Sequence, residues 1–96
     1  MSDVVEGAVK ALNAKLAGET LDGSVKFVIL DQGAVRIDEN GATADDSDAD
    51  CVIFASDDVF RALLDGELNP TTAFMSGKLR IEGDMGLAMK VGSLLS

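Results

Sequence analysis

The densest group of side chains that could do chemistry lies in segment 31–50, which carries seven carboxylates against one cation, Arg36. Three of the aspartates repeat the odd-numbered spacing of a calcium-binding loop: Asp46, Asp48 and Asp50. Position six of that pattern is Cys51 instead of glycine, and position twelve is Asp57 instead of glutamate. We therefore predict a solvated acidic turn at this place and no metal site.

Other catalytic side chains are scarce. The chain has no histidine, which removes the commonest general base and the commonest metal ligand. Its single cysteine, Cys51, lies in the apolar sequence CVIFA, so we interpret it as a small buried hydrophobe and not as a nucleophile. Gly83 and Gly86 match part of the dinucleotide-binding pattern, but its first glycine is missing and too few residues follow for a second parallel strand. These observations predict no enzyme activity and no cofactor.

Residues 85–95, which follow Asp84 as a predicted N-cap, are the most informative segment. On a helical wheel, apolar side chains cover most of the circumference, and Lys90 is the only charge. Two interpretations are open. The helix is packed in the core or in a dimer interface, or it packs on a sheet with one side and lines an apolar cavity with the other. Flexible methionine side chains at three positions suit a cavity for varied ligands: Met75, Met85 and Met89.

The elements that must position these residues follow from hydrophobic periodicity and from turn and capping residues. Helices are predicted over 3–17, from Ser56 to Gly66, from Asn69 to Gly77, and after Asp84. Strands are predicted over 24–30, 34–38, 42–46, 51–55 and 78–82, with 24–30 a central strand covered on much of both faces. This order of elements predicts an α+β fold with helices on one face of the sheet.

Composition limits the classes of function. The 96 residues, 47% of them hydrophobic, fit one domain over 1–96. A net charge of -9 argues against binding nucleic acid and against more than transient contact with anionic membranes. One cysteine cannot form an internal disulfide, and the N-terminus lacks the features of a signal peptide. We therefore expect a cytoplasmic protein.

Residues 69–95, NPTTAFMSGKLRIEGDMGLAMKVGSLL, closely resemble the C-terminal part of the sterol carrier protein two family. The matching pieces are Asn69-Pro70, Ala73-Phe74, Gly77-Lys78-Leu79, Ile81, Gly83-Asp84-Met85 and Gly86-Leu87-Ala88-Met89-Lys90. The rest of the chain agrees in length and element order. The resemblance implies a five-stranded, mostly antiparallel sheet with helices over one face, enclosing a hydrophobic tunnel for a sterol, fatty acyl chain or phospholipid. It implies no catalytic residues.

Two departures from the family bear on function. The last residues, 93–96, are not a peroxisomal address of the Ser-Lys-Leu kind, so a peroxisomal location is not expected. The chain also has no Trp and no Tyr, and nothing obvious selects a rigid sterol over an acyl chain.

The sequence therefore predicts non-catalytic binding and intracellular transfer of a lipid: a fatty acid, acyl-CoA, phospholipid or sterol. The candidate lipid-binding residues are Phe54, Phe60, Leu64, Phe74, Met75, Leu79, Ile81, Met85, Met89 and Leu95. The alternative is an acidic protein–protein interaction module with no small-molecule ligand, in which segment 31–50 meets a basic partner. The sequence leaves the oligomeric state and the tunnel entrance open.

Overall fold

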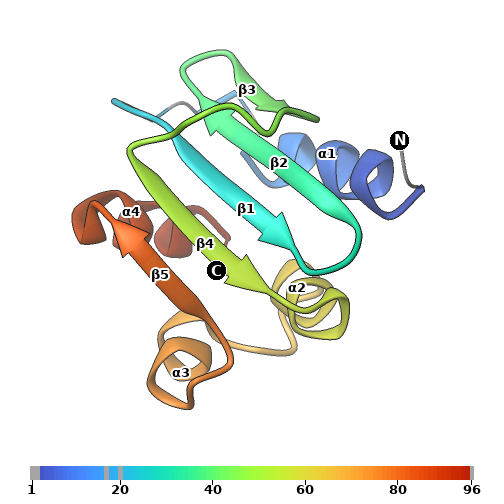
Figure 1. The fold of residues 1–96 in the computed structure, drawn as a ribbon, viewed down its shortest axis with the longest axis vertical. Helices are drawn as coiled ribbons and strands as arrows, with labels where there is room; N and C mark the ends of the chain where they lie inside the picture. Colours follow the sequence, from blue (N-terminus) through green and yellow to red (C-terminus); the bar gives the residue numbers. More distant parts are fainter. Residues whose placement is uncertain (1–2, 17, 20, 96) are drawn as a thin grey trace.

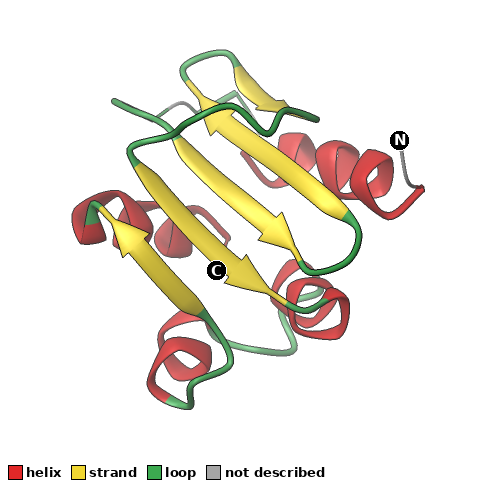
Figure 2. Cartoon of the chain, in the orientation of Figure 1, coloured by secondary structure: helices red, strands yellow, loops and turns green. Residues whose placement is uncertain are grey.

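The computed structural model describes residues 3–16, 18–19 and 21–95. Within them, one five-stranded sheet and four helices form an α+β fold (Figures 1 and 2), as predicted. The strands are β1 (Val25–Ile29), β2 (Gly33–Asp38), β3 (Gly41–Thr43), β4 (Cys51–Ala55) and β5 (Arg80–Gly83). The helices are α1 (Asp3–Leu16), α2 (Asp57–Leu64), α3 (Pro70–Met75) and α4 (Met85–Leu95).

The sheet has the order β3-β2-β1-β4-β5. Only β1 and β4 run parallel, with Phe27 opposite Ile53, and the other neighbouring pairs are antiparallel. A mostly antiparallel sheet is therefore confirmed. The parallel pair arises because the chain leaves the hairpin β2–β3 at one edge and returns on the other side of β1 (Figure 1).

Two predicted strands differ from the structure by more than one residue at an end. The strand predicted over 42–46 is shorter, because Asp45 Oδ1 accepts the Ser47 amide at 2.8 Å and bends the chain into a local turn instead of a ladder. The strand predicted over 78–82 begins two residues later. There the Lys78 amide still bonds the Ala73 carbonyl at 2.9 Å, and Gly77, with φ 75, turns the chain.

The predicted starts of α2, α3 and α4 are confirmed. Ser56 Oγ accepts the Val59 amide at 3.2 Å, and Asn69 Oδ1 accepts the Thr71 amide at 2.9 Å. Asp84 Oδ1 likewise accepts the Gly86 amide at 2.9 Å before α4. The predicted helix 3–17 corresponds to α1, and its last predicted residue lies outside the described residues. Capping side chains thus set where each of α2, α3 and α4 begins.

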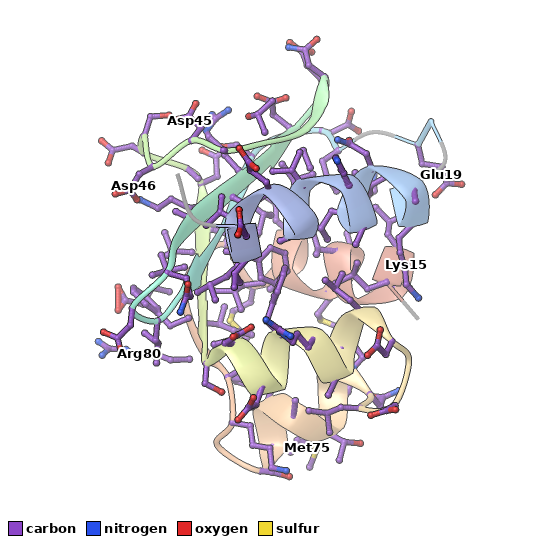
Figure 3. The ribbon with its side chains drawn as sticks, turned by 90° about the vertical axis from the view of Figure 1, so that its right-hand side faces the viewer. Lys15, Glu19, Asp45, Asp46, Met75 and Arg80 are labelled. Atoms are coloured by element: carbon purple, nitrogen blue, oxygen red, sulfur yellow. The ribbon has the colours of Figure 1, made fainter. Side chains whose placement is uncertain are left out.

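All four helices lie on one side of the sheet, which Figure 3 shows edge-on. Between the two layers is the hydrophobic core, in which the Phe27 and Phe60 rings pack with their centroids 5.3 Å apart. The prediction that 24–30 contains a central strand is confirmed, but the expectation that this strand is covered on much of both faces is wrong. Phe27 and its inward neighbours are buried, whereas Lys26 and Val28 on the other face are half-buried and have no helix over them.

No helix in the described ranges is long and apolar enough to cross a membrane.

Candidate functional site

An apolar cavity of about 480 Å³ lies between α3, β5, α4 and the covered face of the sheet. Buried side chains from the two central strands, Phe27 and Ile53, and from α2, Leu63, form part of its wall. The other walls come from residues 69–95, the segment that carries the family resemblance. Its lining residues there are Asn69, Pro70, Thr71, Phe74, Met75, Leu79, Ile81, Met85, Ala88, Met89, Val91, Gly92, Ser93 and Leu95.

Helix α4 packs on the core with one side and lines the cavity with another. Leu87 and Leu94 pack against the core and do not line the cavity, while Met85 and Met89 line the cavity and are exposed. Between these two sides, Ala88, Val91 and Leu95 are buried and also border the cavity. The second interpretation of this helix, which gives it a packed side and a cavity-lining side, therefore matches its position. Spacings of three and four residues place each set on one side of the helix.

Helices α3 and α4 approach each other at Gly92. A Cβ added at Gly92 would lie 3.4 Å from Cβ of Pro70, which is ordinary van der Waals contact, so alanine would fit there. Both residues line the cavity, so α3 and α4 together form one of its walls.

The polar groups of the cavity lie at its exposed rim. They are Asn69, Thr71 and Ser93, all on the surface, and no charged side chain of the described residues lines the cavity. Asn69 Oδ1 is occupied by the amides of Thr71 and Thr72, at 2.9 and 3.2 Å. The interior is thus suited to hydrocarbon, and any polar group of a ligand belongs at the rim, where water reaches it.

The structure brings seven of the ten predicted site residues into this cavity. They are Phe74, Met75, Leu79, Ile81, Met85, Met89 and Leu95. The inward orientation predicted for Leu79 and Ile81 agrees with the structure, in which Leu79 is buried and Ile81 half-buried. Their neighbour Arg80 points to the opposite face of the sheet (Figure 3).

Phe54 does not line the cavity and is a correction to the predicted site. It pairs with Arg80 across β4 and β5, and the Arg80 guanidinium carbon lies 5.6 Å from the centre of its ring. Arg80 is on the side of the sheet away from the helices (Figure 3). Because side chains alternate along a strand, Phe54 lies on that open face while Ile53 faces the cavity. The apolar sequence of 51–55 predicted a strand that is buried throughout, and for this reason the predicted site includes Phe54.

Phe60 and Leu64 also lie away from the cavity. Phe60 is 1% exposed and packs against Phe27 in the hydrophobic core, with the two rings tilted by 58°. Both residues border a second hollow, between α1 and α2, whose lining includes Arg61 and Asp65. The helical spacing correctly placed them on the inward side of α2, but it could not show which inward positions meet the cavity.

Sequence reasoning missed several cavity residues: Phe27, Ile53, Leu63, Ala88 and Val91. All five belong to segments that the sequence predicts to be apolar and largely buried, so their burial was predictable. Their contact with the cavity depends on how far α3 and α4 stand from the sheet, a distance that no local pattern encodes.

The start of α4 is fixed by a small polar cluster at the ends of three strands. The amide of Asp84 bonds the Asp50 carbonyl at 3.0 Å. The Asp50 carboxylate in turn accepts the Ser24 amide at 3.1 Å, and Ser24 Oγ accepts the Asp50 amide at 3.0 Å. Met85, at the first turn of α4, is therefore held at a fixed distance from β1, β4 and β5.

The remaining candidates for chemistry take no part in the cavity. Cys51 is fully buried in β4, and burial, with a further effect of the Asp84 carboxylate, raises the pKa of its thiol, so the reactive thiolate is disfavoured. Asp46 of the acidic turn pairs with Lys26 at 3.1 Å, and Arg36 binds the Asp48 carbonyl at 3.2 Å. Among the described residues no group of three or more acidic, cysteine or histidine side chains could hold a metal ion.

Comparison with known proteins identifies a family and relatives to which this chain is similar. Residues 2–96 match the model of the family described as the SCP-2 sterol transfer family. Sterol carrier protein 2 of Homo sapiens is 53% identical over 49 residues, which are 51% of this chain and 9% of that protein. Hydroxysteroid dehydrogenase-like protein 2 of Homo sapiens is 37% identical over 97 residues, which are 100% of this chain and 22% of that protein. The chain thus spans less than a quarter of these relatives.

The fold also agrees with solved structures. The solution structure of sterol carrier protein-2 from Aedes aegypti, in complex with the C16 fatty acid palmitate, superimposes with a TM-score of 0.77. The superposition covers 100% of this chain and 97% of that one, at 18% sequence identity. At this identity the likeness establishes the fold.

Proposed function

The chain belongs to the SCP-2 sterol transfer family, and we propose that it binds a lipid in the cavity between α3, β5 and α4 and transfers it without catalysing a reaction. The observation that carries the proposal is the cavity, whose volume of about 480 Å³ lies in the range of ligand-binding pockets. Its lining has no charged side chain among the described residues. Each methylene that leaves water there contributes about 0.8 kcal/mol to binding.

The ligand class that we propose is a fatty acyl chain, alone or as part of a larger lipid. Palmitate occupies the Aedes aegypti structure that shares the fold. Met75, Met85 and Met89 are unbranched and flexible, and they can repack around a chain of variable length more easily than around a rigid ring system. The headgroup would remain at the rim near Asn69 and Thr71, so acyl-CoA and phospholipid also fit this arrangement.

No observation favours the alternative of an acidic interaction module. Lys26 and Arg36 already hold the backbone of the acidic turn, with Lys26 Nζ also 3.2 Å from the Asp46 carbonyl. The turn therefore contributes to the structure of the open face. A cytoplasmic location, expected from the sequence, remains part of this proposal.

The direct test is native mass spectrometry of the purified chain, followed by extraction and identification of any bound lipid. We expect a mass increment that organic extraction removes and that added palmitate restores. Displacement of a fluorescent fatty acid by palmitate, by palmitoyl-CoA, by a phospholipid and by a sterol then ranks the ligand classes. A chain of apo mass that binds none of these four would contradict the proposal.

A further inference from the structure

The outer edge of β5 has no partner strand. Within the part of the chain that the structure describes, β5 pairs with β4 on one side only and forms one end of the sheet. An open edge presents backbone donors and acceptors to any strand that can align with it. The other end of the sheet, β3, has three residues and is held to α1 through Asn13, which bonds both backbone groups of Ala42. The β5 edge is therefore the available one.

Exposed apolar side chains flank this edge on both sides in sequence. Five large hydrophobic side chains are exposed in the described residues, and four of them lie on the helices next to β5. Phe74 and Met75 of α3 are 42% and 81% exposed, and Met85 and Met89 of α4 are 43% and 75% exposed. Such a cluster marks an interaction surface, and because all four side chains also line the cavity, this surface is continuous with the proposed lipid site. Figure 1 shows α3 near the beginning of β5 and α4 leaving from its end.

The side chains of β5 are complementary to a second copy of the same strand. Within one chain Arg80 Nη2 pairs with Glu82 Oε2 at 2.8 Å on the open face of the sheet. If two β5 strands pair antiparallel about a two-fold axis at Ile81, Arg80 of each copy also lies opposite Glu82 of the other, so that the two pairs form one network of four alternating charges. Oppositely charged cross-strand pairs stabilise such a ladder. Ile81 meets its own symmetry mate on the covered face, where the cavity lies.

We infer that the β5 edge is a homodimer interface, with Arg80, Ile81 and Glu82 at its centre. The two-fold axis is perpendicular to the sheet, so the helices of both copies stay on one side. The α3 helix of each copy then meets the start of α4 of the other, which covers the exposed Met75 and Met85. The two sheets join into one of ten strands. This inference does not require a bound lipid, although the interface would cover part of the cavity rim.

The first experiment is sedimentation equilibrium of the purified, delipidated chain between about 10 μM and about 1 mM. We expect the apparent mass to rise from the chain mass of 10.0 kDa toward twice that value. A single-chain mass throughout the range would overturn the inference. Binding of that monomer to lipid vesicles through Met75 and Met89 would then explain the exposed methionines.

Charge reversal tests the proposed pairing. Arg80→Glu and Glu82→Arg each place like charges opposite one another in a symmetric dimer, and each also removes the ion pair within one chain, so each variant alone should dimerise more weakly. In an equal mixture of the two variants, every opposed pair carries opposite charges, and the dimer should return. The mixture does not restore the ion pair within one chain, so its recovery reports pairing between the two copies. The control Lys15→Glu changes the net charge as Arg80→Glu does but lies far from β5 (Figure 3), and it should stay dimeric. Single variants that dimerise as the wild type does would contradict the interface.

A disulfide trap tests the register. Antiparallel neighbours have Cα atoms about 4.5–5.5 Å apart, within the range that a disulfide spans. Ile81→Cys should therefore give a covalent dimer under mild oxidation. The control Arg80→Cys lies opposite Glu82 instead of its own mate and should cross-link far less. Equal cross-linking of the two variants would exclude the proposed register. Both variants also contain Cys51, which is buried, so the wild-type chain gives the background level of cross-linking.

Discussion

The backbone amide of Asp84 donates a hydrogen bond to the carbonyl oxygen of Asp50, with 3.0 Å between the two atoms. Through this bond the first turn of α4 is tied to the beginning of β4. Gly83, the last residue of β5, has φ 92, and a Cβ there would collide with the same Asp50 carbonyl. One side of the cavity thus depends on a close backbone approach that only glycine permits.

Gly83→Ala should destabilise the fold by about 1–3 kcal/mol, because alanine is strained at this φ and has no space. Urea unfolding followed by circular dichroism measures the change. Gly7→Ala is the matched control. Gly7 is exposed on α1 with nothing within 4 Å of an added Cβ, so alanine should stabilise by about 0.5–1 kcal/mol. A Gly83→Ala variant as stable as the wild type would contradict the close approach.

Met89→Glu should abolish lipid binding and leave a folded chain. The side chain is 75% exposed in the structure, so the carboxylate is hydrated without ligand, but a bound acyl chain would have to desolvate it. A fluorescent fatty acid titration and a circular dichroism spectrum are read together. Met89→Leu, which keeps an apolar side chain, should bind nearly as the wild type does. Unfolding of Met89→Glu would place Met89 in the solid core.

Truncation of Phe74 and of Phe54 should show which face of the sheet contacts the ligand. Phe74→Ala removes a cavity wall and should weaken palmitate binding about tenfold, a loss of about 1.4 kcal/mol of apolar contact. Phe54→Ala acts on the open face and should leave the affinity unchanged. Isothermal titration calorimetry with both variants measures the difference. Equal losses of affinity would mean that the open face also contacts the ligand.

Removal of bound lipid should lower the melting temperature by several degrees. A ligand that binds only the folded chain stabilises it, and an apolar cavity without its ligand leaves the lining with fewer contacts. Amides of residues 84–95 should lose hydrogen-exchange protection before those of 25–30 and 51–55, because α4 borders the cavity and the strands lie at the sheet centre. If the melting temperature and the hydrogen-exchange protection are the same with and without saturating palmitate, the stability of α4 does not depend on the ligand.

Stability should fall at alkaline pH through Cys51. Burial raises the pKa of its thiol in the folded chain, so the unfolded chain releases this proton at a lower pH than the folded chain does. The stability that the neutral thiol contributes to the folded chain is fully present below the pKa of the unfolded chain, about 8.5. It is lost as the pH rises through the pKa of the folded chain. Urea unfolding between pH 7 and 10 measures the slope. Cys51→Ala should be less stable overall but should lose less stability over this interval.

Local sequence patterns determined much of the fold. Ser56, Asn69 and Asp84 mark the helix starts, because each offers a side-chain oxygen to amides that have no partner in the first turn. Alternation identified Leu79 and Ile81 as inward, and helical spacing identified the two apolar sides of residues 85–95. The similarity of residues 69–95 to a known family then indicated a lipid cavity, which no periodicity by itself could show.

The tertiary structure decided which apolar residues meet that cavity. Phe54, Phe60 and Phe74 are equally apolar in the sequence, yet they lie on the open face, in the solid core and on the cavity wall. A hydrophobic pattern gives the direction of a side chain relative to its own strand or helix. Contact with a cavity depends instead on the distance between layers, which many distant contacts set together, such as that of Pro70 with Gly92.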